Sequence, residues 1–233
     1  MITSPVAAMT RSLPSFVAAT KAAQNGGEGA SGDITINKPS GVAEGDLMVA
    51  FLHSRGSDWV GNPSGWTKKL DPSDWNSWEG SSVEAECWYK VAGSSEGSDY
   101  TWTVSSDSAD RIGVIVAYRN VDKGTIFDAA SSEEISSIAT TNHTLSPAAL
   151  TDPNQLLVGA WFLNRDGTDA LEVSGGPSEM DERIIEEGST GTRDMGIAVY
   201  DEIRRVRTAP GNRTLTTSSG ARSGGMVLSI YGP

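Results

Sequence analysis

The chain has 233 residues, a formal net charge of -12, 26 glycines and one cysteine, Cys87. Because nucleic acids and anionic lipid surfaces are held by clusters of Lys and Arg, this acidic balance argues against both as partners. A single cysteine excludes an internal disulfide, and its place in an alternating strand pattern indicates a buried structural thiol rather than a nucleophile.

Residues 1–13, from Met1 to Leu13, carry little helical or strand pattern, so we expect them to form an N-terminal arm. After them, short runs of Val, Ile, Tyr and Trp alternate with Gly, Pro, Asn and Asp, which is typical of β-strands joined by tight turns. No apolar run reaches the length of a membrane span, and we expect no membrane partner. The first strands are expected around Phe16, Ile34, 47–52, 66–70, 83–91, 100–105 and 112–118.

An internal repeat is the strongest feature of the sequence, because residues 14–124 can be laid over residues 125–233 in the same order. For example, Pro63-Ser-Gly-Trp lies over Pro177-Ser-Glu-Met without a gap. Each half then holds six or seven strands. Strands of this number, joined by short turns, have to close into sandwiches or barrels to bury their apolar faces and protect their edges.

Two packings of the halves remain open at this point. Either each half forms its own sandwich, or the halves interleave into a single large sandwich. The link over residues 119–126 has no flexible Gly/Ser or Pro character, which favours the single sandwich. We therefore predict an all-β fold, an antiparallel β-sandwich of jelly-roll type built from two internally duplicated halves, with the first half over 14–124 and the second over 125–233.

The repeat sorts the seven tryptophans into core and surface candidates. In the alignment, Tyr89 falls on Tyr200, Trp66 on Met180, Trp88 on Val199 and Trp102 on Leu215, while Trp161 falls near Leu52, so these four tryptophans are predicted to lie in the core. Trp75 and Trp78, with Asp74 and Asn76 beside them, occupy a polar stretch without an aromatic counterpart. We take them, together with the ambiguous Trp59, as a candidate contact surface for a sugar or a protein. The alternative is a loop that folds its tryptophans down over the end of the sandwich.

The sequence offers little catalytic chemistry. Its two histidines, His53 and His143, lie in no metal-binding or catalytic motif. The run that starts at Asn164 imitates the beginning of a calcium loop but lacks the second part, which favours an ordinary Asp-Gly turn. We predict no catalytic residue, no cofactor and no metal site. A glycosidase with paired carboxylates remains the catalytic alternative, because 30 acidic residues are present.

Several motifs resemble a module of bacteriophage and prophage virion proteins that also occurs in some bacterial surface proteins. The resemblance covers nearly the whole chain, and its motifs are turns and strands rather than a catalytic signature. The motifs are Ile34-Thr-Ile-Asn-Lys-Pro-Ser-Gly-Val-Ala-Glu-Gly-Asp-Leu-Met-Val, Pro63-Ser-Gly-Trp-Thr, Trp88-Tyr-Lys-Val-Ala-Gly, Tyr100-Thr-Trp, and Tyr118-Arg-Asn-Val-Asp ending at Ile126-Phe-Asp.

The resemblance implies a non-enzymatic virion structural protein: a capsid decoration or head fibre, or a tail appendage, on the particle surface. It implies other virion proteins as partners, a homo-oligomer, and a place in the virion after assembly in the cytoplasm of the bacterial host. The second hypothesis is a carbohydrate-binding host-recognition module that uses the exposed Trp loop on a host surface glycan. The third, a glycan-cleaving enzyme, needs two or three carboxylates that converge in a cleft.

Overall fold

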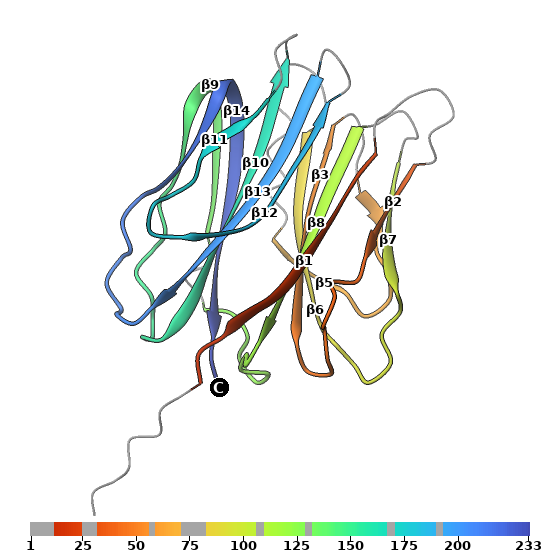
Figure 1. Ribbon diagram of the computed structural model, residues 1–233, viewed down its shortest axis with the longest axis vertical. Helices are drawn as coiled ribbons and strands as arrows, with labels where there is room; N and C mark the ends of the chain where they lie inside the picture. The colour runs from red at the N-terminus through yellow and green to blue at the C-terminus, as the bar shows by residue number, and fades with distance from the viewer. Residues whose placement is uncertain are drawn as a thin grey trace, which may run out of the picture.

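The computed structural model describes residues 12–24, 32–55, 59–70, 83–105, 110–128, 132–166, 171–189 and 193–233 (Figure 1). The described part of the chain contains β-strands and no helix. All of the paired strands run antiparallel. The predicted all-β antiparallel fold is therefore confirmed.

The first half forms a five-stranded sheet in the order β1-β8-β3-β6-β5 and a three-stranded sheet in the order β2-β7-β4. The central strands β3 and β8 are apolar and buried along almost their whole length, as expected where both faces of a sheet are covered. The strands are β1 (Ser15–Gln24), β2 (Asp33–Asn37), β3 (Leu47–Arg55), β4 (Trp59–Gly61), β5 (Thr67–Leu70), β6 (Val83–Val91), β7 (Asp99–Val104) and β8 (Asp110–Arg119).

The second half forms one sheet in the order β11-β14-β10-β13-β12, with β9 also paired to β14. Residues 132–136 of β9 pair with 223–227 of β14, whereas residues 142–145 pair with 213–216. The second half therefore repeats the strand order of the first, with β9 in place of β1 and β2, and β14 in place of β7 and β8. The strands are β9 (Ser132–Leu145), β10 (Gln155–Asp166), β11 (Val173–Gly175), β12 (Asp181–Ser189), β13 (Arg193–Arg204) and β14 (Arg213–Tyr231).

Local details coincide between the halves as well. The ladders β5·β6 and β12·β13 both shift register at the third residue of the outer strand, which is Lys69 in one and Arg183 in the other. The turn before each of these strands is closed by an equivalent hydrogen bond. Trp66 N donates to Pro63 O at 3.3 Å, and Met180 N donates to Pro177 O at 3.1 Å. β-bulges re-aim a strand at one position, so a shared bulge is a specific likeness.

Three apolar clusters hold the strands together. The central core lies between the large sheet of the first half and strands β10, β13 and β14 of the second half. Each half also has an outer core, which β2, β4 and β7 cover in the first half. In the second half, Leu145, Leu171 and Leu215 belong to the outer core. The four tryptophans predicted as core are buried: Trp66, Trp88, Trp102 and Trp161 are 5%, 9%, 0% and 1% exposed.

The prediction that the two halves interleave their strands in a single sandwich is wrong. Every strand pairing among the described residues lies within one half. What the halves share is the central core, to which both contribute large apolar faces. Figure 1 shows this arrangement, with β2 and β7 at one side of the molecule and β9 and β11 at the other. The link near residue 124 thus joins two units that pack face to face.

The alignment of Tyr89 with Tyr200 is shifted by one residue. Tyr200 packs in the outer core of the second half, and in the first half it is Trp88 that packs in the outer core. Tyr89 faces the central core instead. Since side chains alternate between the two faces of a strand, a slip of one residue moves a side chain to the opposite face. The structural counterpart of Trp88 is therefore Tyr200 and not Val199.

At the two bulges, each half contributes a cation that contacts an aromatic ring of the other half. The guanidinium of Arg183, from the second half, lies 4.7 Å from the ring centre of Phe16 in the first half. The ammonium of Lys69, from the first half, lies 4.9 Å from the ring centre of Phe127 in the second. Such cation-π contacts are favourable, and more so where the groups are shielded from water. Equivalent residues thus cross the junction in both directions.

Candidate functional site

The contact surface predicted from the sequence is only partly described by the structure. Trp75, Trp78, Asp74 and Asn76 lie outside the described residues, as do residues 1–11 of the predicted arm. Trp59 is described and is 8% exposed. Its indole packs in the outer core of the first half. This corrects the sequence interpretation of Trp59, because a side chain buried between two sheets offers no flat surface to a partner.

The other sequence candidates for chemistry are structural where they are described. The Cys87 side chain is fully buried, as predicted for a core residue. Asn164 is 4% exposed and its side-chain oxygen accepts a hydrogen bond from Arg55 at 3.0 Å, so that oxygen serves the junction between the halves. Within the described ranges, no three His, Cys, Asp or Glu side chains gather as a metal site would require. The same ranges hold no helix that is long and apolar enough to cross a membrane.

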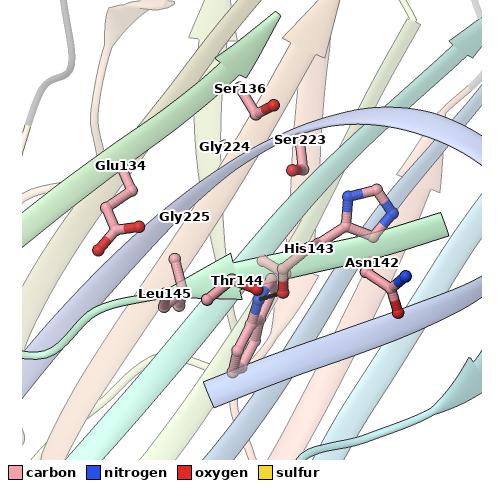
Figure 2. Close-up of a pocket in the computed structure, with 10 residues that line it drawn as sticks. Glu134, Ser136, Asn142, His143, Thr144, Leu145, Ser223, Gly224 and Gly225 are labelled. Atoms are coloured by element: carbon pink, nitrogen blue, oxygen red, sulfur yellow. Dashed lines mark hydrogen bonds between the residues drawn. The ribbon is translucent and has the colours of Figure 1, made fainter. Parts of the chain in front are cut away.

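A cavity of about 210 Å³ opens in the second half where β9 bends away from β14 (Figure 2). We call it the β9-β14 cavity. The bend arises because the register between the two strands shifts near residues 136–140 of β9, where the pair passes from the large sheet to the outer one. Strands that turn from one packed sheet into another leave such corners. The polar residues that line the cavity are Glu134, Ser136, Asn142, His143, Thr144 and Ser223.

His143 is the most deeply buried polar residue that lines the β9-β14 cavity in the described structure, at 1% exposed. Its Nε2 lies 3.1 Å from Thr217 Oγ1. The Thr217 hydroxyl donates its only proton to Ser219 O at 2.7 Å. The Thr217 oxygen therefore has to accept from an Nε2-H of His143. Figure 2 shows the imidazole projecting between Ser223 and Asn142.

The tautomer of His143 follows from this hydrogen bond. Burial lowers the pKa of His143 to about 4, so the ring is neutral near pH 7 and carries a single N-H. With that proton on Nε2, the Nδ1 atom is an unprotonated acceptor. Nδ1 is buried and has no hydrogen-bond partner in the described structure. A buried polar atom without a partner costs about 1 to 3 kcal/mol, so the cavity contains an acceptor that a donor would stabilise.

The charge of the cavity is negative. The carboxylate of Glu134 accepts a hydrogen bond from the backbone N-H of Ser146 and lines the cavity at the same time. None of the residues that line the cavity in the described structure is a Lys or an Arg. Because the lining includes a carboxylate and no Lys or Arg, the cavity is suited to neutral or positively charged molecules.

The same place in the first half is closed by apolar side chains. The strand registers put Ile34 where the second half has His143, and Ile34 is 1% exposed in the outer core. Ala22, which takes the place of Glu134, packs against the same core. The equivalent pairs, first half before second, are Ala22 and Glu134, Ile34 and His143, Ile36 and Leu145, and Arg111 and Ser223.

A second hollow, of about 530 Å³, lies where β8 ends. Its main charged pair is already satisfied within the fold. Arg119 Nε donates to Asp46 Oδ1 at 2.9 Å, and Arg119 Nη2 donates to Asp46 Oδ2 at 2.6 Å. Burial alone would raise the pKa of Asp46, but hydrogen bonds from Arg119 and Ala43 lower it overall. The β9-β14 cavity, with its unpaired acceptor, is therefore the stronger candidate site.

Sequence reasoning missed this cavity because His143 lies in no known motif. Its partner Thr217 is 74 residues away along the chain. A signal did exist in the internal repeat, since the run that starts at Ile34 can be laid over the run that starts at His143. A histidine at a core position of one copy, where the other copy has isoleucine, marks a site at which the two copies differ in chemistry.

Comparison with known proteins found no match for the chain. No protein-family model matches the chain. No curated protein and no solved structure matches it either.

Proposed function

We propose that this chain is a non-enzymatic structural protein of a bacteriophage particle, a capsid decoration or head fibre or a tail appendage on its surface. The observation that carries the proposal is the repeated strand order of the two halves, which pack against each other through a shared core. The assignment to a virion comes from the resemblance of its turn and strand motifs to virion modules. Other virion proteins and further copies of the chain are the partners that this role requires.

We further propose that the halves are duplicated copies of one jelly-roll unit. In the first half β1 pairs with β8, β2 with β7 and β3 with β6, a nested order that is characteristic of jelly rolls. In the second half, β9 and β14 form the two outer pairs, and β10 with β13 forms the inner one. The shared bulges at Lys69 and Arg183 support a common origin for the two copies.

The charged side chains support a structural role because they stabilise the fold itself. Arg183 holds the buried Asp201 with two hydrogen bonds, at 2.8 and 2.7 Å. Arg213 donates from Nε and Nη2 to a single oxygen of Glu202, Oε1, at 3.0 and 2.7 Å. The Arg183-Asp201 pair is bidentate, and such pairs are strongly oriented. Pairs of this kind give a surface subunit rigidity.

The test is to find the protein in intact particles. Particles are purified on a density gradient from a culture that produces the phage, and the protein is quantified by mass spectrometry and located by immunogold labelling. We expect co-purification with particles in a fixed copy number, with label on the head or the tail. If full particles lack the protein while the infected-cell lysate contains it, the structural role is ruled out.

A carbohydrate-binding role is the second candidate, and the difference between the halves near Trp75 and Trp78 favours it. In the second half, β12 extends to Ser189 and β13 begins at Arg193, in the region equivalent to residues 71–82. The sequence of this region contains no aromatic residue. The Trp-rich segment is thus particular to the first half. Binding on a glycan array, lost in the Trp75→Ala/Trp78→Ala variant with an unchanged fold, is expected. An array without signal for the folded protein would exclude this role.

A further inference from the structure

We propose that the β9-β14 cavity binds one small neutral polyol, of monosaccharide size or smaller, with Nδ1 of His143 accepting a proton from one of its hydroxyl groups. The inference goes beyond a structural role and concerns a different place from the Trp75 and Trp78 segment. It begins with the size of the cavity. At about 210 Å³ it is smaller than the roughly 300 Å³ at which pockets for drug-sized ligands begin.

The hydrogen-bonding groups of the cavity determine the class of ligand. Nδ1 of His143 can only accept, because the proton of the ring is held on Nε2 by Thr217. The Glu134 carboxylate also accepts only. An apolar molecule would leave Nδ1 of His143 without a partner, at a cost in free energy. The ligand therefore has to supply O-H or N-H donors.

The remaining polar groups favour a hydroxyl compound over an amine. Ser136 and Ser223 carry hydroxyl groups, which donate as well as accept. An ammonium ion donates only and offers nothing to these donors, whereas each hydroxyl of a polyol does both. Glu134 in turn disfavours anions such as sugar phosphates.

A divalent metal ion does not fit the cavity. His143 and Glu134 are the only imidazole and carboxylate groups that line it in the described structure. The structural basis for binding is therefore a set of neutral hydrogen bonds around one buried acceptor. Figure 2 shows Glu134 and His143 at different sides of the cavity, with Ser223 and Ser136 between them.

The experiment uses the two histidines as spectroscopic probes in the full-length protein. A long-range proton-nitrogen spectrum of ¹⁵N-labelled protein reports the protonation of each ring nitrogen. In the free protein we expect His143 to show a protonated Nε2 and an unprotonated Nδ1. On titration with D-glucose, D-galactose, D-mannose or glycerol, we expect a saturable shift of the Nδ1 signal with at least one of them, while His53 stays unchanged.

Matched variants come from the first half. His143→Ile installs the residue of the equivalent position Ile34, and calorimetry should then show binding of that polyol weakened by about tenfold or more. Glu134→Ala installs the residue of the equivalent position Ala22; it keeps His143 and should weaken binding less, by a few-fold. Thr35→Ala, on an exposed position of the half that lacks the cavity, should leave the affinity unchanged.

Three results would overturn the proposal. The first is a free protein in which His143 carries its proton on Nδ1. The second is an Nδ1 signal that no polyol moves up to its solubility limit. The third is a response to ethanolamine hydrochloride alone, which would make the site one for cations. Failure of these experiments leaves the particle-location test of the structural role unaffected, because that test does not depend on the cavity.

Discussion

Ile34 in the first half and His143 in the second occupy the same place in a shared strand order, yet one closes a core and the other opens a cavity. The glycines beside them show how close the packing is. A Cβ atom on Gly113 would lie 2.6 Å from Cδ1 of Ile36, and one on Gly225 would lie 2.1 Å from Cδ2 of Leu145. In both halves, therefore, the backbone at this glycine lies against the side chain at the equivalent position, Ile36 or Leu145. The comparison teaches that, at equivalent places in the strand order, a sealed corner has apolar side chains and an open one has polar side chains.

The junction between the halves shows a second difference of the same kind. Arg183 and Lys69 take equivalent places at the two bulges and each lies over an aromatic ring of the other half. Arg183 also pairs with Asp201, whose side chain is 2% exposed. In the first half, Tyr89 takes the place of Asp201, so Lys69 has no equivalent buried acid there. The reciprocal contact therefore contains a buried ion pair on one side only.

The largest expected effect tests whether the halves unfold together. Phe162 and Phe51 are fully buried in the central core, with ring centres 6.2 Å apart. Removing either ring creates a cavity that both halves line, so Phe162→Ala and Phe51→Ala should each lower the free energy of unfolding by about 3 to 5 kcal/mol. Urea unfolding monitored by Trp fluorescence and by circular dichroism should give coincident single transitions. Two separated transitions would show that the halves are independent units.

The next effect tests the asymmetry of the junction. Arg183→Ala leaves the buried Asp201 carboxylate without its partner, and we expect a loss of about 3 kcal/mol in the free energy of unfolding. Lys69→Ala removes only a cation-π contact and should cost about 0.5 to 1 kcal/mol. Adding Asp201→Asn to Arg183→Ala should recover part of the loss. Equal losses for Arg183→Ala and Lys69→Ala would contradict the assignment of a buried pair to one side.

The sequence predicted the all-β class, the antiparallel strands and the four core tryptophans, because apolar periodicity and turn residues are local signals. It could not place the halves relative to each other. The choice between interleaved and separate strands depends on contacts between distant segments, and the composition of the link near residue 124, which favoured interleaving, does not report those contacts. The alignment of Tyr89 with Tyr200 failed for a related reason, since Trp88 and Tyr89 are adjacent aromatics and only strand register tells which face each one takes.

The candidate site was less predictable than the fold. Trp59 lies in β4, a strand of three residues, which is too short for an alternating pattern to reveal its buried face. His143 stood in an alternating run, so its burial was readable. Its tautomer was not, because that depends on Thr217 and Ser219 in another strand. Position on a strand can be read locally, whereas hydrogen-bond chemistry requires the fold.

The pH dependence of stability tests the difference between the two equivalent positions, because His143 titrates and Ile34 does not. Burial lowers the pKa of both His53 and His143 to about 4, against about 6.5 in an unfolded chain. Between these values the unfolded state binds the proton and the folded state does not, so stability falls as the pH falls. From pH 7 to pH 5 each histidine should cost about 2 kcal/mol. The two pKa values place most of the loss below pH 6.5.

His143→Ile isolates the contribution of one half to this pH dependence. The variant should lose about 2 kcal/mol less than the wild type between pH 7 and pH 5, because its carboxylates and His53 titrate as before. Urea unfolding at several pH values measures the difference. An unchanged slope would mean that His143 is accessible to protons in the folded protein, and it would weaken the contrast between a polar and a sealed corner.

The smallest expected effect concerns a contact that the halves share. Thr35 and Thr101 have hydroxyl oxygens 2.8 Å apart across β2 and β7, and Thr144 and Thr214 have theirs 2.9 Å apart across β9 and β14. Cross-strand pairs of this type contribute a few tenths to about 1 kcal/mol, so Thr101→Ala and Thr214→Ala should each cost about 0.5 kcal/mol. Because the geometry is the same in both halves, the two losses should agree within error in chemical denaturation. A clear excess for Thr214→Ala would mean that the cavity beside Thr144 already strains the β9·β14 ladder, and the difference between the halves would then extend from side chains to backbone pairing.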